Sequence, residues 1–203
     1  MFTIVVGTSA QLNADVEAEL AVYRHRIFVE QLGWELPNEE EGLERDQFDG
    51  PETLYVVAKD QQGTVCGCAR LLSTEHAYLL SSVFPGLMDG QPLPNSADVW
   101  ELSRYTTQPT GGEVLNREQQ KQRFAALLKA VVEAALERGA RRLITFSYLG
   151  VERLARNFGL HVHRAGAPQM IDGKPVLAFW IELDEQTRNA LGISSHTALR
   201  STH

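Results

Sequence analysis

The sequence lacks long hydrophobic runs: the longest, such as residues 176–181, are far shorter than the ~20 apolar residues of a membrane-spanning helix. It also lacks, after Met1, the basic segment and apolar stretch that are typical of a secretory signal, so we expect a cytoplasmic protein. Cysteine is scarce, because Cys66 and Cys68 are the only two and lie two apart on a predicted strand. A disulfide between them would be strained, and we expect two inert, buried thiols in a reducing compartment.

Segments rich in Pro, Gly or Ser that would link two domains are also absent, which predicts one domain over 1–203. Several catalytic signatures are missing: the G-x-S-x-G elbow, the P-loop, the Rossmann glycine fingerprint and H-E-x-x-H. Their absence argues against the hydrolases, NTPases, dehydrogenases and zinc proteases that use them. The close pair His161 and His163 has no evident third ligand, so we predict no metal site.

Positive charge is in deficit, since 19 Lys and Arg face 26 Asp and Glu, a net charge of −7. This balance argues against general nucleic-acid binding through phosphate contacts. The charge is uneven: residues 1–60 carry 4 basic and 13 acidic side chains, whereas residues 113–164 carry 10 basic and 5 acidic ones. The basic region is either a set of solvated helix faces, which is the simpler interpretation, or a surface that attracts an acidic partner or an anionic substrate.

Hydrophobic periodicity and turn residues predict a mixed α/β protein. Apolar residues recur at helical spacing over 13–32, after which a long irregular segment extends to residue 51. Asn116 and Gln119 have the spacing of a capping box that begins a long helix, and Gly139 is placed to end it. Strands are expected over 53–59, 64–72, 99–106, 142–149, 160–164 and 176–183, a short helix over 151–158 and a loop over 84–94. This order predicts a mixed sheet covered by helices on both faces.

Charged and aromatic side chains are mixed in a way that predicts a small-molecule site. Arg70 and Arg104 lie inside otherwise apolar strands, where a guanidinium that faces the core must be paired. Carboxylates are available at Asp46, Asp49 and Glu101. A partly buried network of this kind suits a zwitterionic ligand. On a regular strand Glu101 and Arg104 would face opposite sides, so we predict a bulge or twist that lets both line one site.

Short motifs occur in a fixed order over about half of the chain. They are Arg24-x3-Phe28-x5-Trp34, Asp46-x2-Asp49, Cys68-Ala69-Arg70-Leu71-Leu72, Phe84-Pro85 and Glu101-Leu102-Ser103-Arg104. Together they resemble the signature of LuxI-type acyl-homoserine-lactone synthases, the autoinducer synthases of bacterial quorum sensing. The resemblance implies a fold related to GNAT acyltransferases, with a central sheet splayed to admit a pantetheine arm.

The resemblance also implies a reaction. S-adenosylmethionine, a substrate rather than a cofactor, receives an acyl chain from acyl carrier protein, and the products are N-acyl-homoserine lactone, holo carrier protein and methylthioadenosine. The amine must first lose a proton, for which Glu101 is the first choice of base and Asp46 the second. Arg24, Asp46, Asp49, Arg70 and Arg104 would shape the catalytic site and hold the amino-acid end, with Phe28 and Trp34 closing over it and residues 35–49 as a mobile lid. Substrate contacts are also expected from Phe84, Ser103, Phe146, Ser147 and Tyr148.

The expected acyl pocket bears on the chain that it accepts. In the resembled family a Thr on this strand tends to accompany 3-oxo chains, and here Ser147 or Tyr148 stands in that place, which favours unsubstituted chains. The bulk of Phe146 and Tyr148 favours a medium length, about C6 to C10. Because acyl carrier proteins are acidic, the basic region becomes a candidate docking surface. Its residues are Arg117, Lys121, Lys129, Arg138, Arg141, Arg142, Arg153 and Arg156.

Two other functions remain open. A GNAT-type N-acyltransferase would take its acyl group from acyl-CoA and pass it to another amine, although the glycine-rich loop of such enzymes has only a weak echo at residues 110–113. A non-catalytic sensor of a fatty ligand would not need the charged network. Asp49→Asn and Arg70→Ala should leave the binding of such a sensor largely intact, whereas both should abolish turnover in a synthase.

Overall fold

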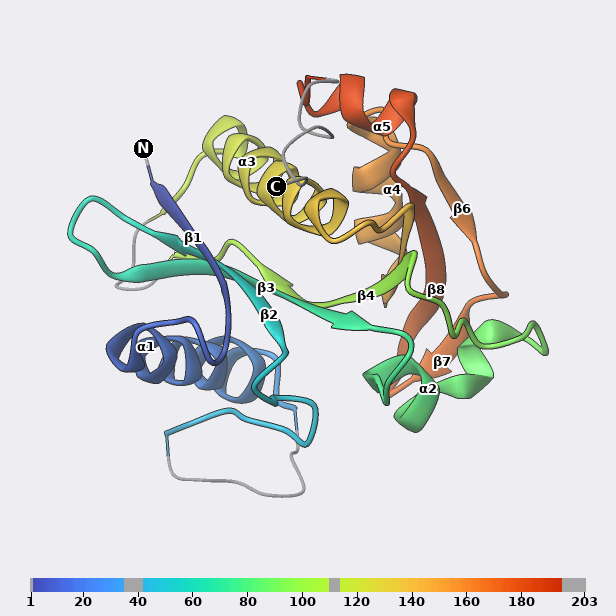
Figure 1. Ribbon diagram of the computed structural model, residues 1–203, viewed down its shortest axis with the longest axis horizontal. Helices are drawn as coiled ribbons and strands as arrows, with labels where there is room; N and C mark the ends of the chain where they lie inside the picture. The colour runs from blue at the N-terminus through green and yellow to red at the C-terminus, as the bar shows by residue number, and fades with distance from the viewer. Residues whose placement is uncertain (1, 35–41, 110–113, 195–203) are drawn as a thin grey trace, which may run out of the picture. The chain divides into compact units, whose positions relative to one another are not determined.

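The computed structural model describes residues 2–34, 42–109 and 114–194 (Figure 1). The strands are β1 Thr3–Thr8, β2 Leu54–Lys59, β3 Val65–Ser73, β4 Val99–Thr106, β5 Arg142–Tyr148, β6 Val162–Arg164, β7 Gln169–Ile171 and β8 Lys174–Glu182. The helical segments are α1 Ala14–Arg24, η1 His25–Gln31, α2 Leu79–Val83, η2 Pro85–Met88, α3 Arg117–Glu137, α4 Leu149–Asn157 and α5 Glu185–Ala190. The described strands form an eight-stranded sheet in the order β1-β2-β3-β4-β5-β8-β6, with β7 paired to β8, which confirms the predicted mixed α/β fold.

The chain divides into two compact units, each built from two segments of sequence. The first unit comprises Met1–Arg70 and Arg104–Ala130, and the second comprises Leu71–Ser103 and Val131–His203. Strands β3 and β4 and helix α3 each run from one unit into the other. The single domain over 1–203 stays a prediction.

The first unit contains the antiparallel pair β1 and β2, which is in register from Thr3 opposite Lys59 to Thr8 opposite Leu54. Helix α1 begins after Asn13, whose side chain accepts the Asp15 N–H at 2.9 Å. The buried face of this helix packs with residues of β2 and β3 in one hydrophobic cluster, which comprises Leu20, Tyr23, Ile27, Phe28, Tyr55, Val57, Val65 and Cys68. This cluster fixes α1 against the strands that carry the charged network.

The helix expected over 13–32 is α-helical only as far as Arg24. From His25 to Gln31 the chain forms a π-helix, in which the Leu32 N–H donates to the Ile27 carbonyl, five residues back, at 3.1 Å. Apolar spacing could not distinguish this wider helix from an α-helix, and long π-helical segments are rare and often lie at functional sites. The predicted capping box is confirmed at the start of α3, where Asn116 and Gln119 exchange side-chain-to-backbone hydrogen bonds of 2.9 Å.

The second unit is organised around β5. Its parallel pairing with β4 runs from Val99 opposite Arg142 to Leu102 opposite Thr145, while its antiparallel pairing with β8 continues to Tyr148. The Thr145 hydroxyl donates to the Leu102 carbonyl at 2.7 Å, at the last of the β4–β5 pairs. Within this unit the loop expected over 84–94 instead begins with η2, directly after the unexpected helix α2, and strand β7 was also not predicted.

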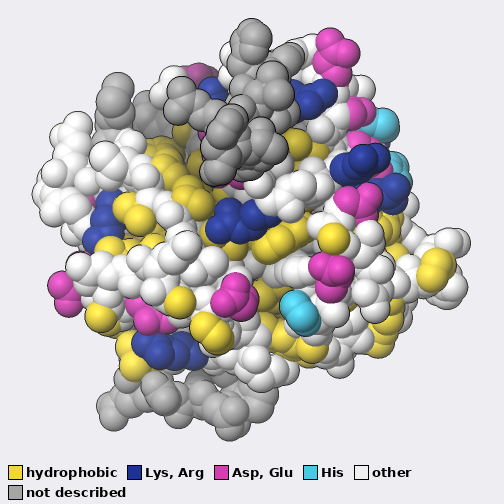
Figure 2. Space-filling model, viewed as in Figure 1, with side chains coloured by type: hydrophobic (Ala, Val, Ile, Leu, Met, Phe, Trp, Pro, Cys, Tyr) yellow, Lys and Arg dark blue, Asp and Glu magenta, His cyan; other side chains and the backbone are white. Residues whose placement is uncertain are grey.

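None of the described helices is long and apolar enough to cross a membrane. Across residues 2–34, 42–109 and 114–194, no group of three or more His, Cys, Asp or Glu side chains is placed to hold a metal ion. On the face shown in Figure 2, basic side chains gather at several separate places among acidic and hydrophobic ones.

Candidate active site

Three arginines and three carboxylates form a buried network in the first unit. Arg24 ends α1, Arg70 lies on β3 and Arg104 on β4, whereas the carboxylates all come from residues 44–49, in the connection between η1 and β2. These are Glu44, Asp46 and Asp49. All six side chains are at most 10% exposed. Buried charges of both signs in equal number leave the network neutral, which is the condition under which such burial is tolerated.

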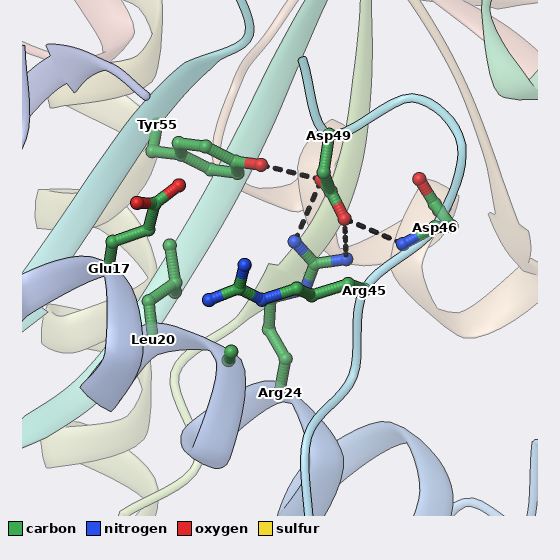
Figure 3. Close-up of a pocket in the computed structure, with 8 residues that line it drawn as sticks. Glu17, Leu20, Arg24, Arg45, Asp46, Asp49 and Tyr55 are labelled. Atoms are coloured by element: carbon green, nitrogen blue, oxygen red, sulfur yellow. Dashed lines mark hydrogen bonds and ion pairs between the residues drawn. The ribbon is translucent and has the colours of Figure 1, made fainter. Parts of the chain in front are cut away.

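Each carboxylate in this network bridges two arginines. Arg24 binds Asp49 through two parallel hydrogen bonds of 2.9 Å and also donates to Glu44 through Nε (Figure 3). The Arg70 Nη1 atom lies 2.6 Å from Asp46 and 2.8 Å from Asp49. The Arg104 Nη2 atom lies 2.9 Å from Glu44 and 2.8 Å from Asp46. The six residues therefore form a closed alternating ring, which we call the charged ring.

The charged ring holds the Asp49 and Glu44 carboxylates ionised. Burial by itself would raise the pKa of Asp49, but Arg24 and Arg70 hold that pKa well below its usual range. Burial opposes ionisation of Glu44 in the same way, and Arg24 and Arg104 lower its pKa. Asp49 also accepts the Tyr55 hydroxyl at 2.5 Å and the Asp46 backbone N–H at 2.8 Å. These contacts fix the loop that carries the carboxylates.

Two aromatic rings cover one edge of the charged ring. Gly33, at φ +73°, lets the chain turn sharply after the π-helix, and the Trp34 N–H donates to the Phe28 carbonyl at 2.9 Å. The two rings are stacked with centroids 4.8 Å apart. The Arg104 guanidinium carbon lies 4.9 Å from the Trp34 ring centroid and 5.5 Å from that of Phe28, within cation–π distance. The structure thus brings Phe28 and Trp34 to the arginine that closes the ring.

Strand β4 is irregular at Arg104, as predicted, with a left-handed backbone at φ +53°. A non-glycine residue in this region is strained, and such strain gathers at functional sites. That Glu101 and Arg104 line one site stays a prediction. The Cys68 thiol donates to the Arg104 carbonyl at 3.2 Å, and burial raises the pKa of Cys68 to about 12. Cys66 is also a buried thiol, so the expectation of two buried thiols is confirmed, and their inertness stays a prediction.

A small cavity of about 140 Å³ opens beside the Arg24–Asp49 pair. It is lined by Glu17, Leu20, Ala21, Arg24, Arg45, Asp46, Asp49 and Tyr55, and Figure 3 shows the Arg45 side chain extending toward Glu17. This volume is smaller than the roughly 300–1,000 Å³ of a typical ligand pocket. Residues 35–41 of the expected lid lie outside the described residues, and so does the weak match to a glycine-rich loop at residues 110–113.

Glu101 lies in the second unit and is fully buried. Its Oε1 accepts the Leu79 N–H at 3.3 Å and its Oε2 accepts the Leu80 N–H at 2.6 Å, so the carboxylate contacts the first turn of α2. Nearby in the same unit, the Phe84 and Phe146 rings have centroids 5.0 Å apart. The other expected substrate contacts in this unit are the buried Ser103 and the half-buried Ser147 and Tyr148.

The expected carrier-docking residues divide between the two units. Arg117 and Lys121 are exposed and Lys129 is half-buried on the part of α3 in the first unit. In the second unit, Arg141 and Arg153 are exposed, Arg138 donates to the Ala134 carbonyl, Arg142 lies 5.1 Å from the Trp180 ring centroid and Arg156 donates to Glu152 at 2.9 Å. Arg164, which also donates to Glu152, was not among the expected residues. Their role in docking stays a prediction.

The sequence reasoning missed two members of the site, Glu44 and Tyr55. Glu44 is fully buried and bridges Arg24 and Arg104, and its backbone N–H donates to the Ala21 carbonyl at 3.1 Å. Within an acidic loop, residue type alone could not separate this glutamate from its solvated neighbours. The available signal was numerical, because three arginines that enter a core call for three carboxylates.

Comparison with known proteins shows which family the chain belongs to. The autoinducer synthase family model matches residues 8–191. An acyl-homoserine-lactone synthase of Ralstonia solanacearum is 46% identical over 199 residues, which cover 98% of this chain and 97% of that protein. The crystal structure of TofI in a ternary complex with an inhibitor and MTA has a TM-score of 0.84 and 45% identity over 96% of this chain and 99% of that one. The structure of BjaI, a CoA-dependent acyl-homoserine lactone synthase, with SAM and isopentyl-CoA has a TM-score of 0.80 and 26% identity over 96% and 90% of the two chains. The chain therefore belongs to the autoinducer synthase family and is an enzyme, an acyltransferase of that family.

Proposed function

We propose that this enzyme makes N-acyl-homoserine lactones from S-adenosylmethionine and an acyl chain delivered by acyl carrier protein. The charged ring carries the proposal, because a buried, neutral array of guanidinium and carboxylate groups has the chemistry to match both charges of an amino-acid end. The solved relatives bound to MTA, or to SAM and isopentyl-CoA, support S-adenosylmethionine as one substrate.

The first step is acyl transfer. The α-amino group, with an ordinary pKa of ~8, loses a proton and attacks the thioester carbonyl. A C–N bond forms, the C–S bond breaks, and the thiol of the carrier leaves. Asp46 is the proposed base, acting directly or through a water molecule, because Glu101, the first choice from the sequence, already accepts the N–H groups of Leu79 and Leu80. A backbone N–H of a strand is the expected donor to the transient oxyanion.

The second step is ring closure. The carboxylate of the acylated amino acid attacks its own γ-carbon, and the C–S bond to the sulfonium breaks, so that neutral methylthioadenosine leaves. Because the leaving group is already activated by its positive charge, orientation supplies most of the acceleration. In this proposal Arg24, Arg70 and Arg104 hold the carboxylate in line, with Phe28 and Trp34 excluding water.

The acyl chain is proposed to be unsubstituted and of medium length, about C6 to C10. The Phe84–Phe146 pair supports a bounded apolar site. On the same strand the Thr145 hydroxyl donates to the Leu102 carbonyl and is thus engaged within the sheet, while Ser147 or Tyr148 stands in the place of the Thr that accompanies 3-oxo chains. A chain with a 3-oxo substituent as the preferred substrate would contradict this part of the proposal.

The acyl donor is the point at which a second candidate arises, since a solved relative is described as CoA-dependent. We therefore test purified protein with S-adenosylmethionine and either acyl carrier proteins or coenzyme A charged with butanoyl to tetradecanoyl chains, and identify the products by mass spectrometry. Acyl-homoserine lactone with methylthioadenosine, formed faster from the carrier protein, is expected. Faster turnover of acyl-CoA would make acyl-CoA, rather than acyl carrier protein, the acyl donor. N-acylation without ring closure would contradict the proposed function.

A further inference from the structure

We infer that Glu101 is a positioning residue that sets acyl-chain preference through Phe84. The inference rests on the proposed function, because it concerns how that same enzyme chooses among acyl chains. It assigns Glu101 a role different from that of the general base. The evidence is a closed series of contacts that links β4, α2 and β5 within the second unit.

The first contact joins β4 to α2. The Glu101 carboxylate is fully buried and receives the backbone N–H groups of Leu79 and Leu80. These N–H groups belong to the first turn of the helix, where no carbonyl within the helix can accept them. A buried carboxylate that satisfies such donors fixes the start of the helix firmly.

The second contact carries this position to the aromatic pair. Helix α2 is five residues long, and the Phe84 N–H donates to the Leu80 carbonyl at 3.1 Å. One turn of helix therefore separates the residue that Glu101 holds from the residue that contacts the Phe146 ring. A displacement at Leu80 moves Phe84 with it, because no flexible segment lies between them.

The third contact returns to β4. Phe146 directly follows Thr145, whose hydroxyl donates at 2.7 Å to the carbonyl of Leu102, the neighbour of Glu101. Strand β4 thus anchors both sides of the aromatic pair, Phe84 by way of α2 and Phe146 by way of β5. The spacing of the two rings, 5.0 Å between centroids, depends on both anchors.

The segment after Phe84 is held as well, which leaves it little freedom to compensate. A Cβ atom on Gly166 would lie 2.3 Å from the Leu87 carbonyl oxygen, so η2 packs directly on backbone at that point. The Gln169 side chain donates to the Gly86 carbonyl. With the far end fixed, loss of the Glu101 contact shifts the position of Phe84 rather than being absorbed along the chain.

The two possible roles of Glu101 predict different kinetics. A general base acts on the amine, so its loss lowers turnover equally for every acyl chain and alters the pH profile. A positioning residue acts on the aromatic pair, so its loss changes the ratio of kcat/KM values between long and short chains. One extra or missing methylene in an apolar pocket changes such a ratio of kcat/KM values by roughly 10-fold or more.

The test compares Glu101→Gln, Thr145→Val, Phe84→Leu and the Glu101→Gln/Phe84→Leu double variant. Release of methylthioadenosine is measured with hexanoyl and decanoyl carrier proteins across pH 6 to 9. We expect Glu101→Gln and Thr145→Val each to change the decanoyl-to-hexanoyl ratio by about fivefold or more, with an unaltered pH profile. In the Phe84→Leu background, Glu101→Gln should change that ratio no further. Equal loss for both chains with a shifted pH profile, or an unchanged ratio, would overturn the inference.

A second measurement is independent of turnover. Amide hydrogen exchange followed by mass spectrometry should show the peptide over 79–88 exchanging at least about tenfold faster in Glu101→Gln than in the wild type, with α3 peptides unchanged. Unchanged exchange over 79–88 would overturn the positioning role even if no donor were turned over. Absence of turnover in the wild type would contradict the proposed function instead, so the two failures are distinct. If Glu101→Gln does not fold, Thr145→Val takes its place in the measurement of the decanoyl-to-hexanoyl ratio.

Discussion

Replacement of Asp49 by asparagine tests the charged ring most directly. Asp49 accepts two hydrogen bonds from Arg24 and one each from Arg70, the Tyr55 hydroxyl and the Asp46 backbone N–H. An asparagine keeps one acceptor oxygen and turns an NH₂ group toward the donors of the other. The substitution also leaves the buried ring with a net charge of +1. Breaking a buried pair in this way costs about 3–5 kcal/mol of unfolding free energy.

For a chain of this length, 1 kcal/mol lowers Tm by roughly 2–4 °C, so Asp49→Asn should lower Tm by about 6–20 °C. Circular dichroism at 222 nm measures Tm, and release of methylthioadenosine at a temperature well below it measures turnover of the folded variant. We expect no turnover, because the guanidinium of Arg24 loses its fixed orientation. Asp172→Asn, in the exposed turn after β7, is the matched control and should leave Tm and turnover unchanged. An Asp49→Asn protein with wild-type Tm and full turnover would refute the reasoning.

Three further outcomes are expected. The unfolding free energy should fall as pH drops below about 5, because folding lowers the pKa values of Glu44 and Asp49 and their stabilising contribution is lost as pH falls through the folded pKa. Urea titrations from pH 7 to 3 measure this free energy. Asp49→Asn should show a shallower fall. Cys68 should resist iodoacetamide in the folded protein at pH 8 and react in urea, because its raised pKa keeps the thiol protonated; labelling of the native protein would contradict its burial. Gly166→Ala should lower unfolding free energy by about 1–3 kcal/mol, since its Cβ would meet a backbone oxygen at 2.3 Å, whereas Gly150→Ala, which meets nothing within 4 Å, should not.

Much of the fold could be predicted where the signal is local. Asn116 and Gln119 encode the start of α3 through their own hydrogen bonds, and β4 was predicted with its observed bounds. The missed elements depend on tertiary contacts. Helix α2 is too short to show apolar periodicity, and its first N–H groups, those of Leu79 and Leu80, are satisfied by Glu101, 22 and 21 residues away in sequence. No pattern within residues 79–83 could reveal that partner.

The candidate site shows the same division. The need for partners followed from Arg70 and Arg104 alone, because guanidinium groups inside apolar strands must be paired. The identity of those partners did not follow, since Glu44 is one of many acidic residues in its loop. The partners of Arg104 did not follow either: Glu44 and Asp46 pair with it, and the Glu101 carboxylate accepts backbone N–H groups of α2. Long-range partner choice is decided by how the loop packs, which residue types do not specify.

The closed form of the charged ring has a consequence for how this enzyme can diverge. Its arginines come from three elements, and their charges would repel one another if the segment bearing Glu44, Asp46 and Asp49 were not in place. Formation of the site and consolidation of the first unit are therefore one event. Active-site residues commonly trade stability for function, but here the two requirements coincide. A substitution at any of the six positions lowers both stability and activity. Substitutions that change the acyl chain of the product should therefore accumulate in the second unit, around residues such as Phe84 and Phe146.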